Sequence, residues 1–247
     1  MDKDGIFQRM VTDREVTIEK VRAFVSNPNL VGGRFLGKYT IATTSGTTGT
    51  PGIFVLDDHA MKVTDAIALH TLRDWLGFGG LIRLLVGGRR MAMTIAPGHS
   101  ATAVAAARLR QSASGRKRTL ALPVHAPLSK LVRQLNAFRP ALFAPYPSIA
   151  KLLADEQEAG RLDIRPMLMP LAAEGLPIGE YDRIATAFDT KVGNSYAATE
   201  CPFLSSDCKY GWLHVNRMNG LHTTSATTIR FAAGIQVGKS ELKGPAR

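Results

Sequence analysis

The sequence has 247 residues, of which 45% are hydrophobic, and its formal net charge is +11, which predicts a globular chain with one large core or two small ones. Its two cysteines, Cys201 and Cys208, are too few for a disulfide framework in a chain of this size. The start lacks the basic-then-apolar order of a signal peptide, and arginines interrupt the most apolar stretch, residues 81–97, which is shorter than the ~20 residues that span a bilayer. We therefore expect a cytoplasmic protein that does not cross a membrane.

The first element is a helix at residues 13–25, where apolar residues recur near one face. Asp13 is placed to cap its amino terminus, and Pro28 follows its end. We take residues 1–38 as an N-terminal helical segment.

The next feature is the loop at residues 43–52, Thr-Thr-Ser-Gly-Thr-Thr-Gly-Thr-Pro-Gly. Glycine lets backbone N–H groups converge on an anion, and the hydroxyls donate further hydrogen bonds, so this composition favours a phosphate site. The β-prone residues 38–42 and 53–56 predict a hairpin around the loop. The alternative is a flexible Ser/Gly linker, which the flanking strands disfavour. A Walker loop is excluded because no lysine lies within the stretch.

An α/β alternation follows. A helix capped by Asp57 or Asp58 is expected through Trp75, and glycines at 77–80 should end it. Strand-like segments are expected at residues 91–95, 120–123, 141–144, 167–171 and 191–194. Helical patterns separate them at residues 100–110, 128–138, 147–159 and 178–188. The fold class predicted by this order is α/β, a mostly parallel sheet with flanking helices.

Positive charge is concentrated between Arg73 and Arg139, where the only acidic residue is Asp74. A nucleic-acid-binding face is one interpretation, but the stretch has neither a recognisable module nor aromatic residues at a repeated spacing. The alternative is a set of solvated helix faces that attract a polyanionic small molecule such as ATP or CoA.

Residues 44–51, Thr-Ser-Gly-Thr-Thr-Gly-Thr-Pro, resemble the signature loop of the adenylate-forming enzymes, the acyl-CoA synthetases and their relatives, written T-S-G-S/T-T-G-x-P-K-G. The chain departs from that pattern at Gly52, where the family usually has lysine, and this variant is similar to the phenylacetate-CoA ligase branch. The resemblance implies the N-terminal domain of such an enzyme and a loop that holds the phosphates of ATP. The residues so implicated are Thr44, Ser45, Gly46, Thr47, Thr48 and Gly49.

A second motif is Tyr196-Ala-Ala-Thr-Glu200, which resembles the family's Y-G-x-T-E motif with Ala197 in place of glycine. The resemblance implies that Tyr196 stacks on adenine, that the Thr199 hydroxyl binds the α-phosphate and that Glu200 holds Mg²⁺, a cation that prefers oxygen ligands. We expect Thr199 and Glu200 to be the catalytic pair.

Three further segments follow expected strands. Ala173, Glu174 and Gly175 resemble the family's Gly-Glu segment that touches the adenine, and Tyr146 opens a helix as a similar tyrosine does beside the family's substrate cavity. His99 also follows a strand and is a candidate for the acyl pocket, although such a histidine is often a loop residue with satisfied hydrogen bonds. Ligands in open α/β sheets bind at the carboxyl ends of the strands, where these residues are expected.

Zinc is a weaker alternative. Cys201, Cys208 and His214 lie close in sequence, but structural zinc needs four ligands with short spacings, and this set has three with none at the usual spacing.

The resemblance extends over about residues 13–216, with residues 39–216 as the AMP-binding α/β core and 217–247 as an irregular tail without family resemblance. It implies a carboxylic acid, notably an aryl acid, together with ATP, Mg²⁺ and CoA. The family's later aspartate, hinge and small domain with its catalytic lysine have no counterpart here. We therefore expect a truncated ligase that binds nucleotide weakly without completing thioester synthesis. An unpaired sheet edge would favour a homodimer. The alternatives are an inactive nucleotide-binding remnant and, less favoured, a nucleic-acid-binding protein.

Overall fold

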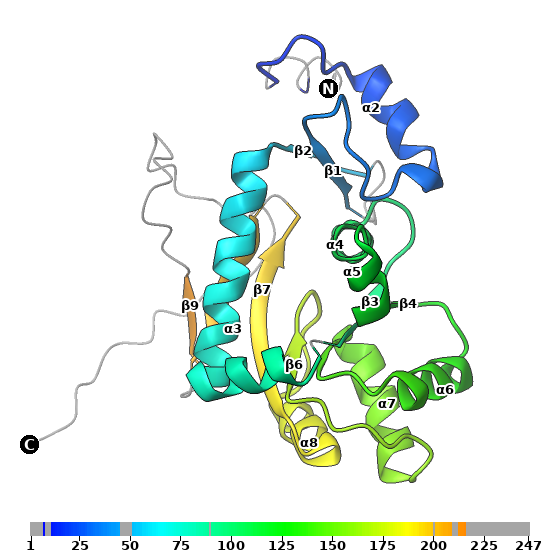
Figure 1. Cartoon of the computed structure of the whole chain (residues 1–247), viewed down its shortest axis with the longest axis vertical. Coiled ribbons are helices and arrows are strands. Elements are labelled where there is room, and N and C mark those ends of the chain that lie inside the picture. Colours follow the sequence, from blue (N-terminus) through cyan, green and yellow to red (C-terminus); the bar gives the residue numbers. More distant parts are fainter. Residues whose placement is uncertain are drawn as a thin grey trace, which may run out of the picture. The chain divides into compact units, whose positions relative to one another are not determined.

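The computed structural model describes Phe7 and residues 11–44, 51–88, 90–199, 201–208 and 212–215, all within the compact unit Met1–Asn216. The tail expected at residues 217–247 lies outside the described residues. In the described part of the chain, seven strands form one sheet in the order β4-β3-β5-β6-β7-β8-β9, and β1 and β2 form a separate hairpin (Figure 1). The strands are β1 Thr40–Thr43, β2 Ile53–Leu56, β3 Met91–Ile95, β4 Thr119–Pro123, β5 Leu142–Ala144, β6 Leu168–Leu171, β7 Lys191–Ala198, β8 Cys201–Asp207 and β9 Leu213–Val215.

The seven-stranded sheet is mostly parallel. Strands β4, β3, β5, β6 and β7 pair in parallel, whereas β7 with β8 and β8 with β9 pair antiparallel. The β3–β4 register places Met91 opposite Thr119. The central strands are short apolar runs because helices cover their faces, and Phe143 and Leu168 are fully buried. The predicted α/β class is therefore confirmed.

Helices connect the parallel strands and form the main core with them. The helices of the described chain are α2 Ile18–Val25, α3 Asp58–Val86, α4 Ala101–Leu109, α5 Ala113–Arg118, α6 Leu128–Phe138, α7 Pro147–Glu158 and α8 Ile178–Phe188, together with the 3₁₀ turn η1 Pro28–Leu30. Leu135 of α6, Leu153 of α7 and Phe188 of α8 pack with the sheet in one cluster and are fully buried. Each such side chain contributes about 1.5–3 kcal/mol through burial, which holds the strand ends in place.

The helix expected to end at the 77–80 glycines continues past them. Asp57 caps α3 by accepting a hydrogen bond from the backbone N–H of Ala60 at 2.7 Å. Gly77 takes φ 67° and ψ 174°, so the helix breaks there, but a second helical segment then runs to Val86. The positive φ needs glycine, and in the second segment Leu84 is buried in a cluster with Trp75.

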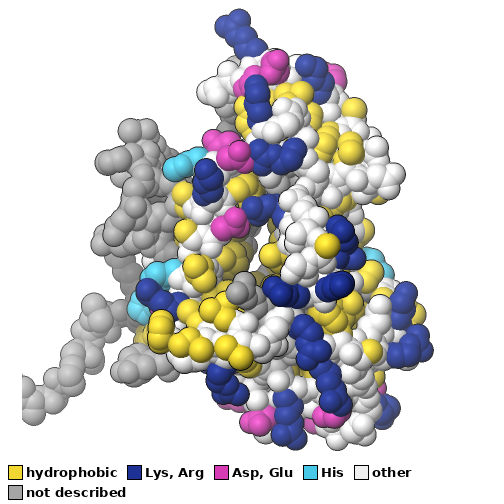
Figure 2. All heavy atoms as spheres, viewed as in Figure 1, with side chains coloured by type: hydrophobic (Ala, Val, Ile, Leu, Met, Phe, Trp, Pro, Cys, Tyr) yellow, Lys and Arg dark blue, Asp and Glu magenta, His cyan; other side chains and the backbone are white. Residues whose placement is uncertain are grey.

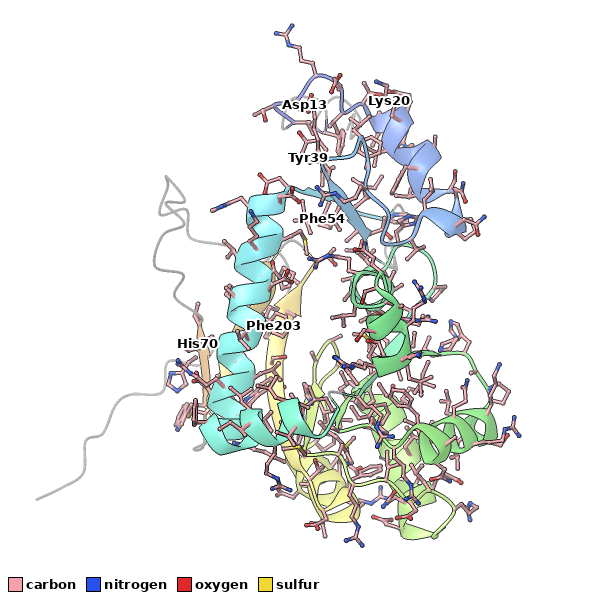
Figure 3. The ribbon with its side chains drawn as sticks, in the orientation of Figure 1. Asp13, Lys20, Tyr39, Phe54, His70 and Phe203 are labelled. Carbon is pink, nitrogen blue, oxygen red and sulfur yellow. The ribbon has the colours of Figure 1, made fainter. Side chains whose placement is uncertain are left out.

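The N-terminal part contains α2 and the β1–β2 hairpin, and the prediction that Asp13 caps the helix is wrong. Thr17 caps α2 by accepting from the backbone N–H of Lys20 at 3.4 Å, and the helix begins at Ile18. The Asp13 carboxylate instead accepts from the Tyr39 hydroxyl at 2.7 Å (Figure 3). The Asp13 carboxylate, which the local sequence pattern assigned to the helix end, thus binds a residue that is distant in the sequence.

Three features of the sheet region were not predicted. α5 is a short basic helix before β4, and β8 returns antiparallel to β7, which itself extends to Ala198 and not only to residue 194. Among the described residues, no helix combines the length and apolar character needed to cross a bilayer.

Candidate functional site

The candidate site lies at the carboxyl edge of the parallel strands. β3, β5, β6 and β7 are neighbours in the sheet and run in the same direction, so the segments that follow them meet at one edge. Those segments carry His99, Tyr146, Glu174 and Thr199, respectively. This is the edge where open α/β sheets bind ligands.

The neck of the Ser/Thr/Gly loop is closed by Thr44. Its backbone N–H donates to the carbonyl of Gly52 at 3.0 Å, and its side-chain oxygen accepts from the Gly52 N–H at 2.8 Å. The loop therefore leaves and rejoins the β1–β2 hairpin at one point. Residues 45–50, which include Ser45, Gly46, Thr47, Thr48 and Gly49, lie outside the described residues.

The hairpin is attached to the carboxyl edge through β1. The backbone N–H of Thr43 donates to the carbonyl of His99 at 2.8 Å, and Thr43 also pairs in parallel with Ser100. Both residues belong to the turn between β3 and α4. The neck of the loop is thus adjacent to the end of β3.

Tyr146 joins the ends of β3 and β5. Its backbone N–H donates to the side-chain oxygen of Thr94 at 2.7 Å, and its hydroxyl lies 3.1 Å from that of Thr102. Thr102 also accepts from the backbone N–H of Ala96 at 3.2 Å. Thr94 and Thr102 escaped the sequence reasoning. For Thr94 the available signal was a threonine near the carboxyl end of a strand that is otherwise apolar, whereas Thr102 lies in helix α4.

Glu174 lies beside Tyr146 in the same edge. Its carboxylate accepts from the backbone N–H of Ser148 at 2.9 Å, in the first turn of α7. The residue before that helix, Tyr146, makes no side-chain cap. Glu174, in the segment after β6, supplies the acceptor, and its negative charge suits the helix amino terminus. Ala173 has φ 73°, a conformation unusual for a residue other than glycine.

His99 is buried, with 2% of its surface exposed, and its ring centroid lies 5.4 Å from that of Phe24 in α2. Neither ring nitrogen makes a hydrogen bond of standard geometry with the described part of the chain. Burial lowers the pKa of His99, and the nearby carbonyls of Leu30 and Val25 oppose this to a smaller degree. The imidazole therefore favours its neutral form and faces the N-terminal helix through Phe24.

The second motif lies on β7 and at its turn, beyond the strand end expected from the sequence. Ser195 is 6% exposed and Tyr196 is 39% exposed, because successive strand residues point to opposite faces. Tyr196 thus lies on the face opposite Gly193, which Trp75 of α3 covers. Thr199 is half-buried at the turn between β7 and β8, and Glu200 lies outside the described residues.

The zinc alternative gains no support from the geometry. Within the described ranges, no three His, Cys, Asp or Glu side chains come together as a metal site, so Cys201, Cys208 and His214 do not form one. Cys201 and Cys208 are both half-buried.

No protein-family model and no curated protein matches this sequence. Among solved structures, an open conformation of 2-hydroxyisobutyryl-CoA ligase with 2-HIB-AMP and CoA is similar, with a TM-score of 0.47 and 19% identity over 78% of this chain and 44% of that one. VinN is similar with a TM-score of 0.46 and 16% identity over 69% of this chain and 39% of its own. A malonyl-CoA ligase with methylmalonyl-CoA and AMP has a TM-score of 0.45 and 19% identity over 71% and 36% of the two chains. The chain spans less than half the length of each of these structures.

Proposed function

We propose that this chain is the nucleotide-binding part of an ATP-dependent carboxylic acid–CoA ligase that forms an acyl-adenylate. The observation that carries the proposal is the bond between Thr43 and the carbonyl of His99, which sets the neck of the Ser/Thr/Gly loop beside the end of β3. The neck of the loop, at Thr44 and Gly52, and the segments after β5, β6 and β7 then border one edge, as a nucleotide site at the carboxyl end of the sheet requires.

In this proposal the chain's residues act by positioning and by stabilising charge. The hydroxyl of Thr44 and the N–H and hydroxyl donors of residues 45–49 hold the phosphates. Tyr196 stacks on the adenine, and the Thr199 hydroxyl contacts the α-phosphate. A carboxylate oxygen of the acid attacks the α-phosphorus, the bond to pyrophosphate breaks, and the acyl-adenylate remains. In a whole ligase the thiolate of CoA then attacks the acyl carbon and AMP leaves, a step that we do not expect this chain to complete by itself. The carboxylate oxygens of Glu200 suit Mg²⁺, which would neutralise phosphate charge.

The finer assignment rests on sequence. Gly52 in place of the family's usual lysine favours the phenylacetate-CoA ligase branch, and hence an aryl acid. We assign residues 39–216 to the nucleotide-binding core, preceded by the segment 1–38 and followed by 217–247. His99 and Tyr146 remain the candidates for the acid pocket.

The test is Mg·ATP binding by calorimetry. Ser45→Ala with Thr47→Ala removes two donors to a charged group, and each such bond is worth about 1.5–3 kcal/mol, so binding should weaken tenfold or more. Ser129→Ala with Thr186→Ala removes two exposed hydroxyls outside the site and should leave the affinity unchanged. Equal affinities of the two folded double variants for Mg·ATP would show that the loop does not belong to the nucleotide site.

A second measurement separates a ligase from a nucleotide-binding protein without turnover. The wild-type chain is incubated with Mg·ATP and a panel of aryl acids, and pyrophosphate release is measured. Acid-dependent release supports acyl-adenylate formation. Nucleotide binding without release from any acid contradicts the ligase assignment and favours the inactive alternative.

A further inference from the structure

A pocket of about 340 Å³ opens at the amino edge of the parallel sheet, opposite the candidate nucleotide site. Arg90 lines it just before β3, Arg139 before β5 and Arg165 before β6. These three strands are neighbours that run in the same direction, so their first residues share one edge. The topology therefore brings together three arginines that lie far apart in the sequence.

Backbone hydrogen bonds hold the three strand starts in register. The N–H groups of Ala141 and Leu142 donate to the carbonyl of Arg90 at 2.9 and 3.1 Å. The N–H of Met167 donates to the carbonyl of Ala141 at 2.8 Å. The arginine side chains thus project from a backbone that is fixed before any ligand arrives.

The loop on the other side of the pocket is also held. Asn136 of α6 donates to the carbonyl of Arg161 at 2.9 Å and accepts from the N–H of Asp163 at 2.8 Å. Arg139 ends α6 in the left-handed conformation, with φ 47°, and its N–H donates to Leu135 at 2.7 Å. These three bonds restrict the backbone that carries the pocket's charged groups.

The pocket carries an excess of positive charge. Arg139 pairs with the Asp163 carboxylate at 3.4 Å, and both side chains are exposed, so this contact is weak. Arg90 and Arg165 form no ion pair with any carboxylate in the described ranges. Lys and Arg side chains also outnumber Asp and Glu over the lower part of the face in Figure 2. Three guanidinium groups against one carboxylate leave a local charge suited to an anion.

We propose that this pocket binds a small organic phosphate. The guanidinium groups of Arg90 and Arg165 present planar pairs of donors that match phosphate oxygens. Pro140, Ile164 and Met167 supply an apolar floor for the organic part of the ligand. The volume lies at the lower end of the range of small-molecule sites. Five residues of β3, at about 3.3 Å each, separate the pocket from the carboxyl edge by roughly 16 Å, so one phosphate cannot occupy both places.

The test uses AMP, inorganic phosphate and pyrophosphate as probes, titrated by calorimetry at fixed ionic strength. The variant is Arg90→Gln with Arg165→Gln, two exposed residues whose loss leaves the core intact. The control is Arg14→Gln with Lys20→Gln, which removes the same charge from one exposed position before α2 and one in α2. Lys20 is labelled in Figure 3. We expect the pocket variant to lose at least tenfold in AMP affinity and the control to lose less than twofold. The same titrations are repeated in a Thr44→Val background, with and without the pocket substitutions, so that AMP binding at the carboxyl-edge site contributes less to the measured affinity.

The outcomes decide between the ligand classes. AMP binding that persists in Thr44→Val and disappears on adding the pocket substitutions supports the proposal, whatever becomes of the ligase assignment. Equal losses in the pocket and control variants would mean a general charge effect and overturn it. If AMP binds no more tightly than inorganic phosphate, the proposal that the ligand is an organic phosphate is overturned. The pocket variant could also keep its affinity for all three probes and bind a single-stranded oligonucleotide more weakly than the wild type does. That result would overturn the small-molecule ligand and indicate that the pocket binds nucleic acid.

Discussion

The indole ring of Trp75 lies directly on the backbone of Gly193: a Cβ atom at position 193 would stand 2.6 Å from the indole Cε2. The indole N–H also donates to the Asp207 carboxylate of β8 at 2.8 Å, and the Lys191 ammonium donates to the Trp75 carbonyl. One tryptophan thus fastens α3 to β7 and β8. Because β7 carries Tyr196 and leads to Thr199, this contact positions one wall of the candidate site.

Gly193→Ala should destabilise the protein. The methyl group would meet the rigid indole ring, so the helix or the strand must shift, and overpacking of this kind costs typically 1–3 kcal/mol. Urea unfolding measures the loss. Gly179→Ala is the matched control, since nothing lies within 4 Å of the Cβ it would introduce, and in helix α8 alanine should be neutral or mildly stabilising. A loss no larger than in the control would show that Trp75 moves aside freely.

Thr94→Val should destabilise the edge of the sheet. Its side-chain oxygen, in a residue only 1% exposed, accepts from the Tyr146 N–H at 2.7 Å, and valine leaves that donor without its partner. The expected cost is about 1–3 kcal/mol in the free energy of unfolding. Thr94→Ser retains the oxygen and should recover most of the loss apart from the missing methyl group. If serine proves no better than valine, the hydrogen bond contributes little.

His99 should make stability depend on pH. Burial lowers its folded-state pKa below the ordinary value of 6.5, so the unfolded chain binds the proton more readily. The free energy of unfolding should therefore fall as pH drops below about 6.5 and stop falling below the folded-state pKa. Urea unfolding between about pH 7.5 and 5 measures this, above the range where carboxylates titrate.

His99→Phe should flatten that pH dependence, because phenylalanine suits the contact with Phe24 and does not titrate. His125→Gln, a change at an exposed histidine in the turn after β4, is the control and should keep the dependence. A slope that survives in His99→Phe would assign it to another group.

Glu200→Gln should remove the Mg²⁺ dependence of nucleotide binding. Glutamine keeps the shape of the side chain and loses the charge that a hard cation prefers. ATP affinity is measured with Mg²⁺ and with a chelator present. Glu19→Gln, an exposed position in α2, should behave as the wild type. Persistence of the metal effect in Glu200→Gln would count against this residue as the ligand.

The local pattern of the sequence determined most of the elements. The bounds expected for α6, α8 and β3 agree with the structure, because apolar spacing and flanking breakers act within a few residues. The alternation of strands and helices likewise determined the parallel character of the sheet. The short helix α5 escaped because its basic residues carry no apolar face that could reveal it.

The tertiary structure decided what the side chains do. Asp13 and Glu174 each accept from a group more than twenty residues away, Tyr39 and Ser148, and no local spacing encodes such partners. Strand order brings Arg90, Arg139 and Arg165 to one pocket, and it brings the segments that carry Tyr146, Glu174 and Thr199 to the opposite edge. The physical reason is that apolar periodicity specifies how each segment folds, whereas which segments become neighbours depends on packing and pairing across the whole sheet.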